Sequence, residues 1–302
     1  MAYRNVFVSS AAKLSLKNNQ LIVFTNMEYT IPIEDISTLL IESSQVNVSS
    51  ALISKLSDNG VCIFFCDEKH TPNGVLIPFN VHSRKLKVLQ LQLEIKKPLQ
   101  KSIWQDIVVQ KIINQGKVLK LCGKETYKEI VSISQKVLSD DVSNMEAVSA
   151  SKYFKDLFGS GFSRGQDIAT NARLNYGYAI LRGAIARSLV VYGLEPCIGV
   201  HHKSQLNAYN LADDIIEVFR PMVDLAVYNL ETAQPQENEN LSVKDKQILY
   251  NLLSCDVVSA GEIHQLSYAI ERTVQSYVAS LQKGEKNLKL CEIVPIKQHE
   301  YE

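Results

Sequence analysis

The first eighty residues alternate apolar and polar side chains over short distances, the period of a β-strand. In AKLSLKNNQLIVF the alternation runs on both sides of Asn18-Asn19, a pair typical of a hairpin turn. Further extended runs follow in EYTIPIEDISTLLIES, where Pro32 marks a sheet edge or a strand start. The stretch SSALISKLSDNG predicts a short helix that begins at a serine and ends at Gly60, before the strand VCIFF. These patterns predict a small, mostly β domain.

From about Val81 the apolar residues recur at three- and four-residue steps, which is the period of a helix. Pro98 and Gly116 are expected to interrupt this pattern. Residues 231–240, ETAQPQENEN, lack periodicity and predict an exposed loop, after which Ser242 caps another helix. The stretch SAGEIHQLSYAIERTVQSYVASLQKG predicts a long amphipathic helix that closes the domain.

The expected fold class is therefore α+β, with a small strand-rich domain followed by a larger helical one. We expect an N-terminal β domain over residues 1–80, a basic linker or helix over 81–101, and an all-α domain over 102–302.

The composition is that of a globular chain with two domains, and the net charge limits how the protein can bind nucleic acid. The 302 residues are 46% hydrophobic and 21% charged, which is enough for two cores. Net charge is formally zero, which argues against a protein that coats nucleic acid over its whole surface, so any nucleic-acid contact must be local.

The cysteines and the chain start exclude several classes of protein. Six scattered cysteines without paired CxxC clusters indicate neither a zinc ribbon nor a disulfide framework. No stretch approaches the roughly 18 apolar residues of a membrane span, and MAYRNVFVSS lacks the order of a secretion signal. We therefore expect a cytoplasmic protein.

The stretch GVHHKSQLNAYNLADDIIEVFRP gathers two histidines and three carboxylates within seventeen positions. On a helix, Asp213 and Asp214 are both neighbours of Glu217. Two carboxylates about 4 Å apart repel by roughly 4 kcal/mol at an effective dielectric of 20, so they need a cation or full solvation. Two interpretations stay open: half of a metal site, or a solvated acidic helix start favoured by the helix dipole, with Arg220 as a local partner.

A second acid, Glu146, precedes another predicted helix in VSNMEAVSASKYF. The run from Ser143 to Glu146 fits a capping box, in which the glutamate closes back on the helix start. On these residues alone, a cap explains Glu146 as well as a metal site does.

Four motifs occur in one order along the second half of the chain: Glu146 with Tyr153-Phe154, Asn171 through Asn175-Tyr176-Gly177-Tyr178, Gly199 to His202, and Asp214 to Glu217 with Phe219-Arg220-Pro221. Their order, spacing and flanking residues resemble the CRISPR-associated adaptation integrases, the Cas-one family, which insert new spacers into CRISPR arrays. The β-then-helical organisation also matches, so the resemblance covers nearly the whole chain. The doubled histidine and NLADD are most similar to the type II branch, found beside the single-protein RNA-guided nuclease.

Two departures from the family pattern affect the site. Ala147 stands where the family often has glycine, a change that a helix tolerates. The doubled histidine makes the ligand ambiguous; the count from Gly199 selects His202, and His201 then points elsewhere, toward DNA or solvent.

The resemblance implies a chemistry and a set of site residues. In the family, the 3′-hydroxyl of a short DNA fragment attacks a phosphodiester at the edge of the repeat, and hydrolysis is the same attack by water. The implied metal ligands are Glu146, His202 and Glu217, and Asp214 is a fourth catalytic residue that ligates or holds the others. Such oxygen and imidazole donors suit Mn²⁺ or Mg²⁺, and zinc is less expected without cysteine. Because only neutral imidazole binds metal, activity should fall below about pH 6.5.

Basic and polar residues around these motifs are the candidates for DNA contact and for support of the site. The candidates for DNA binding are Arg84, Lys85, Lys87, Lys96 and Lys97 in the linker, with Arg164, Arg173 and Lys203 nearer the metal; a solvated face is the alternative for the linker residues. Tyr153, Asn171, Asn175 and Tyr178 are expected to surround the metal ligands or to form a buried polar network, and for Tyr178 we favour the buried role.

The resemblance also implies partners. These are double-stranded DNA as spacer precursor and CRISPR repeat, a second copy of the chain in a homodimer, a small ferredoxin-like adaptation partner in a heterohexamer, and other type II CRISPR proteins, with no membrane. The β domain is assigned to dimerisation and partner docking. Two other classes stay open: an unrelated metal-dependent nuclease or hydrolase, and a DNA-bridging scaffold without activity, in which Glu146 is only a cap and Asp214 and Glu217 form a solvated face.

Overall fold

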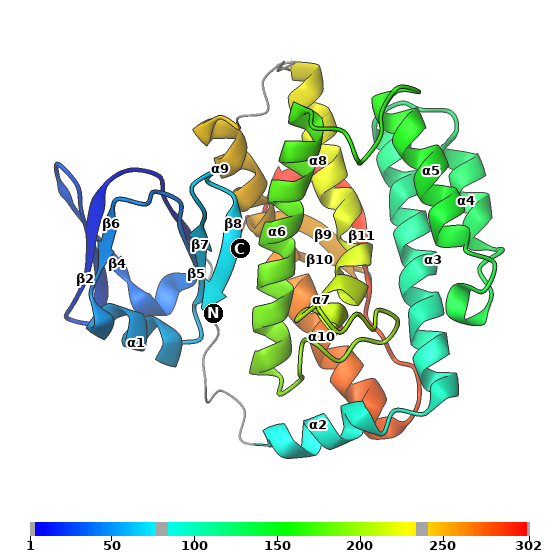
Figure 1. The fold of residues 1–302 in the computed structure, drawn as a ribbon, viewed down its shortest axis with the longest axis horizontal. Helices are drawn as coiled ribbons and strands as arrows, with labels where there is room; N and C mark the ends of the chain where they lie inside the picture. Colours follow the sequence, from blue (N-terminus) through cyan, green and yellow to red (C-terminus); the bar gives the residue numbers. More distant parts are fainter. Residues whose placement is uncertain (1–3, 77–83, 234–240, 301–302) are drawn as a thin grey trace. The chain divides into compact units, whose positions relative to one another are not determined.

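The computed structural model describes residues 4–76, 84–233 and 241–300. The chain divides into two compact units, residues 1–83 and 84–302, so the division falls three residues after the expected end of the β domain. Figure 1 shows the strands of the first unit in blue and cyan, and the helices of the second in cyan to orange.

The N-terminal unit is built from strands β1 to β8 and one helix, α1. Two four-stranded sheets have the orders β1-β5-β7-β8 and β4-β3-β2-β6. Buried leucine and isoleucine side chains of both sheets and of α1 form one core. The bounds are β1 (Arg4–Val8), β2 (Ala12–Lys17), β3 (Gln20–Phe24), β4 (Glu28–Pro32), β5 (Ile36–Ile41), β6 (Val46–Val48), α1 (Ser50–Asp58), β7 (Cys62–Cys66) and β8 (Pro72–Leu76).

The turn, cap and edge residues of this unit have the conformations and places that the sequence predicts. Strands β2 and β3 form an antiparallel hairpin, and its turn residues Asn18 and Asn19 have positive φ angles of 51° and 59°, as a two-residue turn of this kind requires. The hydroxyl of Ser49 caps α1, and Gly60 follows its end with a φ of 68°. Pro32 ends β4, an edge strand, where no ladder hydrogen bond is lost.

The C-terminal unit is mainly helical. The long helix α3 packs against α4, α5, α8 and β11, while α6 packs against α8, α9 and α10. A 3₁₀ turn, η3 (Ile216–Val218), joins α7 to α8. The helices are α2 (Lys85–Leu93), α3 (Lys97–Leu121), α4 (Tyr127–Ser134), α5 (Met145–Phe158), α6 (Ala169–Val191), α7 (Asn210–Ile215), α8 (Arg220–Ala233), α9 (Val243–Asn251) and α10 (Leu266–Lys283).

The α+β class is confirmed, but the expectation of an entirely helical second domain is wrong. Strands β9 (Cys255–Ser259), β10 (Glu262–Gln265) and β11 (Cys291–Gln298) form a three-stranded sheet with the order β10-β9-β11. The turn between β9 and β10 is Ala260-Gly261, and both residues have positive φ. The long helix that the sequence predicts includes β10 and the end of β9 as well as α10, and no strand is predicted at β11.

Two expected interruptions also differ from the structure. Pro98 lies in the first turn of α3, where its missing N–H costs no hydrogen bond. Gly116 lies inside α3, and a Cβ there would come within 2.4 Å of a Val131 methyl group, so this glycine permits close packing of α3 on α4. Residues 231–233, expected in a loop, belong to α8, while 234–240 and 81–83 lie outside the described residues.

In the part of the chain that the structure describes, every helix is too short or too polar to cross a membrane.

Candidate functional site

Two acids from separate elements meet at one lysine in the C-terminal unit. Glu146 lies in the first turn of α5, Glu217 in the turn between α7 and α8, and Lys111 in the middle of α3. The Lys111 ammonium forms ion pairs with Glu146 Oε1 and with Glu217 Oε2. Because both carboxylates contact the same nitrogen, these two oxygens lie within two hydrogen-bond lengths, roughly 6 Å, of each other.

The lysine and Glu217 are both buried, so their charges are stabilised by each other. Burial lowers the pKa of Lys111, but the carboxylates of Glu217 and Glu146 outweigh it, and the pKa is raised overall. Burial raises the pKa of Glu217, but Lys111 and Arg220 outweigh it, and the pKa is lowered overall. Arg220 contacts Glu217 Oε1 at 3.0 Å. Glu217 Oε2 contacts the Lys111 ammonium, so each oxygen of this buried carboxylate has a cationic partner.

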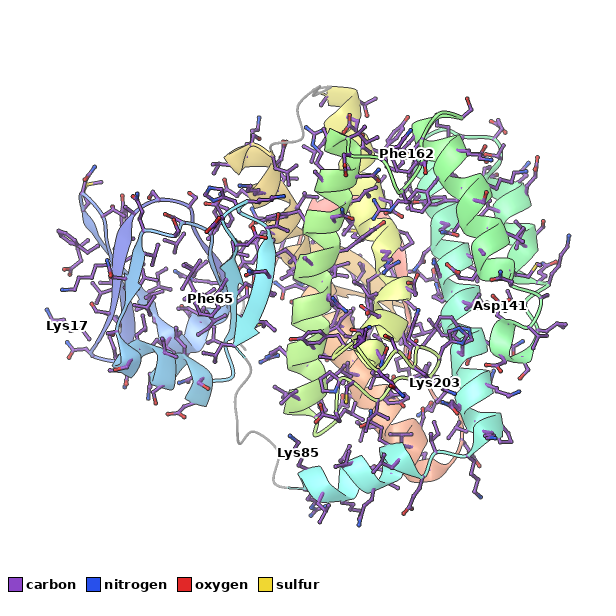
Figure 2. All side chains as sticks on the ribbon, in the orientation of Figure 1. Lys17, Phe65, Lys85, Asp141, Phe162 and Lys203 are labelled. Atoms are coloured by element: carbon purple, nitrogen blue, oxygen red, sulfur yellow. The ribbon has the colours of Figure 1, made fainter. Side chains whose placement is uncertain are left out.

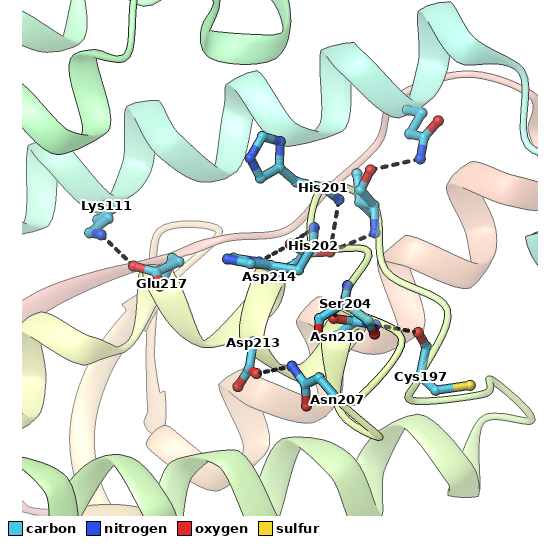
Figure 3. Close-up of polar contacts among 12 residues, drawn as sticks. Lys111, Cys197, His201, His202, Ser204, Asn207, Asn210, Asp213, Asp214 and Glu217 are labelled. Atoms are coloured by element: carbon cyan, nitrogen blue, oxygen red, sulfur yellow. Dashed lines mark hydrogen bonds and ion pairs between the residues drawn. The ribbon is translucent and has the colours of Figure 1, made fainter.

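The carboxylate of Asp214 organises the histidine loop and is completely buried. It accepts backbone N–H hydrogen bonds from Val200, His201 and His202, and its Oδ1 lies 2.7 Å from His202 Nδ1 (Figure 3). In neutral imidazole this contact places the proton on Nδ1 and leaves Nε2 as an acceptor. The hydrogen bond to Asp214 also raises the pKa of His202. Asp214 is therefore a positioning residue whose oxygens are already occupied.

The two histidines differ in their contacts with α3. The ring of His201 stacks on Trp104 with a centroid separation of 4.2 Å and an interplanar angle of 6°. His202 meets the same indole edge-on at 6.0 Å. The stacking fixes the His201 ring against α3, whereas His202 alone contacts Asp214 through its side chain.

The start of α5 is capped by an aspartate that the sequence analysis did not single out. Asp141 accepts hydrogen bonds from the N–H groups of Met145 and Glu146, at 2.8 and 3.0 Å. No side chain at Asn144, the residue before the helix, caps it. The capping-box interpretation of Glu146 is therefore wrong, because Asp141 supplies the cap and the Glu146 carboxylate contacts Lys111 instead.

A buried polar network lies behind the acids. Asp224 of α8 accepts hydrogen bonds from the hydroxyls of Tyr153, at 3.0 Å, and Tyr178. Burial raises the pKa of Asp224 to about 6, although both tyrosine hydrogen bonds act to lower it. Arg220, which pairs with Glu217, lies over the Tyr178 ring at 5.0 Å. This arrangement fits the buried role expected for Tyr178 and links it to the acids.

The two asparagines of α6 bind an arginine. Arg164 donates to Asn171 Oδ1 at 2.6 Å and to Asn175 Oδ1 at 2.8 Å, and its guanidinium lies 5.3 Å from the centre of the Tyr178 ring. Arg164, expected to bind DNA, is thus held against α6 by three side chains.

One of the predicted DNA contacts is wrong. Arg173 is fully buried and forms ion pairs with Glu231 and with Asp245, the latter at 2.9 Å. It joins α6 to α8 and α9 and cannot reach DNA in this fold. The other basic candidates are exposed, as Figure 2 illustrates for Lys85 and Lys203: Arg84, Lys85, Lys87, Lys96, Lys97 and Lys203.

The predicted metal ligands are partly brought together. Glu146 and Glu217 share Lys111, and the charge of His202 contributes to lowering the pKa of Glu217. Within the described residues, no three histidine, cysteine, aspartate or glutamate side chains lie close enough together to hold a metal ion. The donor types still fit a hard divalent cation, since they comprise two carboxylates and an imidazole whose Nδ1 is held by Asp214, which leaves Nε2 for a ligand.

The solvated-face interpretation of the acidic helix is wrong for two of its three residues. Asp214 and Glu217 are buried, and only Asp213 is partly exposed, where it pairs with Arg182 at 2.7 Å. The helical spacing predicted that Asp214 and Glu217 are neighbours, but not that both are buried.

Three functional residues were missed by sequence reasoning: Lys111, Asp141 and Asp224. Lys111 lies in a segment with several lysines, and nothing in the sequence distinguishes it clearly from the others. Its one local signal of burial is that apolar residues flank the Gln110-Lys111 pair. Asp224 is an acid on an otherwise apolar helix face beginning at Pro221, and that pattern could have marked it as buried.

Comparison with known proteins shows the family of this chain. Residues 6–254 match the family described as CRISPR associated protein Cas1. The CRISPR-associated endonuclease Cas1 of Neisseria meningitidis serogroup C is 40% identical over 305 residues, covering 100% of both chains. The CRISPR-associated endonuclease Cas1 1 of Francisella tularensis subsp. novicida is 26% identical, covering 91% of this chain and 94% of that one.

Solved structures show the same fold. A CAS1 protein from Thermotoga maritima superposes with a TM-score of 0.75 at 18% identity, covering 94% of this chain and 99% of that one. A casposase bound to its integration product gives a TM-score of 0.76 at 20% identity, covering 95% and 92%. With the family match spanning most of the chain and a full-length relative at 40% identity, this chain belongs to the Cas1 family of CRISPR-associated proteins.

Proposed function

We propose that this chain is the DNA endonuclease and integrase of CRISPR adaptation, which joins the 3′-hydroxyl ends of short DNA fragments to the repeat by transesterification. The observation that carries the proposal is the convergence of Glu146 and Glu217, from α5 and from the turn before α8, on one buried point. The names of the full-length relative, an endonuclease, and of the structural neighbour bound to an integration product support the same reaction class.

Glu146, Glu217 and the Nε2 atom of His202 would hold a Mn²⁺ or Mg²⁺ ion. When bound, such an ion supplies Lewis-acid chemistry at the phosphoryl oxygens and at the attacking and leaving oxygens. The chain contributes the positioning: Asp214 holds His202, Asp141 holds the helix start that carries Glu146, and Arg220 holds Glu217. Each expected ligand is thus held in place by a different residue.

The histidine sets the pH range of this site. Only neutral imidazole offers a lone pair to a metal, and the hydrogen bond to Asp214 raises the pKa of His202 above its usual value. The loss of metal binding on acidification should therefore begin above the pH of about 6.5 that an unperturbed histidine would give.

The names of two solved structures support the proposal of DNA and protein partners. Structural neighbours include a Cas1-DNA complex with a TM-score of 0.56 and a Cas6-RT-Cas1–Cas2 complex with a TM-score of 0.71. We propose that this chain binds double-stranded DNA, forms a homodimer, and assembles with a small ferredoxin-like adaptation partner in a heterohexamer. We also assign it to the type II branch, on the doubled His201-His202 and NLADD.

Strand transfer into a supercoiled plasmid that carries the repeat tests this function. Glu146→Gln and His202→Ala should each reduce joining by about a hundredfold or more, while folding and DNA binding are retained. Glu285→Gln, which changes an exposed acid after α10, is the matched control and should join normally. Cleavage without joining by the wild type would favour an unrelated nuclease, and DNA binding without cleavage or joining would favour a scaffold. Normal joining by both site variants would show that Glu146 and His202 do not carry the reaction. Each of these results contradicts the proposal.

A further inference from the structure

The Lys111 ammonium lies where a cation shared by Glu146 and Glu217 would lie. Its side chain is 6% exposed, and its nitrogen contacts one oxygen of each acid. Lysine is almost never fully buried unless it is paired, and here its two partners are the predicted metal ligands themselves. Arg220, the other cation beside these acids, contacts only the opposite oxygen of Glu217.

The charges of this group balance without a metal. Glu146 and Glu217 carry two negative charges, and Lys111 and Arg220 carry two positive charges in direct contact with them. The protein therefore holds its acids together with its own cations. A divalent ion that binds the same oxygens meets an ammonium at contact distance, and the repulsion between them is strong in a buried site.

We propose that Lys111 is a positioning residue that acts as an internal counter-cation. It holds Glu146 and Glu217 together when no metal is bound, and it competes with the divalent cation for Glu146 Oε1 and Glu217 Oε2. This inference rests on the proposed metal site. Its consequence is a site that is folded in the absence of metal and whose affinity for the cation is held low by the chain itself.

Lys111→Met tests the proposal, because methionine keeps the length and apolar character of the lysine stem and removes the charge. Titration calorimetry should show that the full-length variant binds Mn²⁺ about tenfold more tightly or better, since the competing charge is gone. The metal-free variant should melt at a lower temperature than the wild type, because the buried Glu217 and the partly buried Glu146 then lack their shared cation. Added Mn²⁺ should raise its melting temperature by more than it raises that of the wild type.

Lys117→Met is the matched control. Lys117 lies on the same helix and pairs with the single exposed acid Glu292, so its loss should leave Mn²⁺ affinity unchanged. If Lys111→Met does not fold, Lys111→Gln removes the same charge with a polar side chain that carries two N–H donors, and the same affinity change is expected.

The outcomes separate this inference from the proposed function. If Glu217→Gln abolishes Mn²⁺ binding but the Lys111 variants bind Mn²⁺ as weakly as the wild type or more weakly, the metal site stands and the counter-cation role is overturned. If neither Glu146→Gln nor Glu217→Gln changes Mn²⁺ binding, the metal is not at this site, and the inference is overturned together with it.

Discussion

Gly199 lies at the closest approach of the histidine loop to Asp214. A Cβ atom at this position would come within 2.4 Å of the His202 carbonyl oxygen and 2.8 Å of Asp214 Oδ2, both well inside contact distance. Gly199→Ala must therefore displace the carboxylate that orients His202. We expect DNA joining to fall by about a hundredfold or more, with a weaker Mn²⁺ affinity, because a ligand loses its orienting hydrogen bond.

Gly165→Ala provides the control for this change. Gly165 lies in an exposed loop, and a Cβ there meets no atom within 4 Å. The control should join DNA at the wild-type rate in the plasmid assay. Wild-type joining by Gly199→Ala would mean that the loop can move without affecting His202, and that Asp214 does not position it.

At the scale of residues, the sequence indicates contacts between residues that lie close together in the chain. It misses contacts that form only when distant elements pack together. His202, Asp214 and Glu217 share one short segment, so they appear as one cluster in the sequence, and the family resemblance implies their joint role. Lys111 precedes Glu146 by 35 residues and Glu217 by 106, and Asp224 follows Tyr153 by 71. Those contacts depend on how α3, α5 and α8 pack, and no local pattern encodes that packing.

The start of helix α5 depends on Asp141, whose two carboxylate oxygens accept from the N–H groups of Met145 and Glu146. In Asp141→Asn only one oxygen remains as an acceptor, and the amide N–H₂ faces the other backbone donor. Asparagine tolerates the positive φ of 47° at this position, so the change tests the cap and not the backbone. We expect a loss of about 1 kcal/mol in the free energy of unfolding, with reduced joining because Glu146 is the second residue of the helix.

Asp140→Asn is the control, since Asp140 also has a positive φ, 66°, and pairs with Lys101 at 3.3 Å near the surface. Urea denaturation should show a change of less than about 0.5 kcal/mol for this variant. Equal effects from the two substitutions would show that the charge of the segment matters and that the cap does not.

Asp224 joins α8 to α5 and α6 through two tyrosine hydroxyls, and this contact makes stability depend on pH. Burial raises its pKa from 3.8 to about 6, so the folded state binds the proton more tightly than the unfolded state. The stabilisation by protonated Asp224 is complete below about pH 4 and is lost as the pH rises through about 6. The shift corresponds to about 3 kcal/mol.

Asp224→Asn removes this titration. Urea denaturation of both proteins between pH 4 and pH 7 should show the wild type losing stability relative to the variant as the pH rises, by up to about 3 kcal/mol. A constant offset between the two proteins is expected from the lost acceptor. A difference in unfolding free energy that stays constant over this range would show that Asp224 is not destabilised by burial.

The elements themselves were predictable where a local signal is strong. The β2-β3 hairpin has an Asn-Asn turn between alternating strands, and α1 has a serine cap. The β9-β10 hairpin has strands of five and four residues directly followed by α10, so the helical period of the long segment concealed the short alternation. Gly116 looked like a break because its reason, the approach of Val131 from α4, is a tertiary contact.

For the molecule as a whole, a formal net charge of zero confines DNA contact to local basic surfaces. The exposed lysines of α2 and of the start of α3, Lys85, Lys87, Lys96 and Lys97, form such a group, with Glu94 the sole acid among residues 84–101. Each phosphate contact releases counterions, so it contributes about 0.9 to the slope of log K against log salt concentration. If these lysines bind DNA, replacing all of them with alanine should make that slope shallower by up to about 4.

Fluorescence anisotropy with a short duplex, measured from low to physiological salt, tests this expectation. Lys283→Ala, at the exposed end of α10, is the control for the loss of a surface charge and should leave the slope unchanged. A weaker affinity with an unchanged slope would mean that the substitutions act through folding of the unit. An unchanged affinity and slope would show that these lysines form a solvated face and do not bind DNA. We would then expect DNA to contact residues near the acids, where Lys203 is an exposed candidate beside His202.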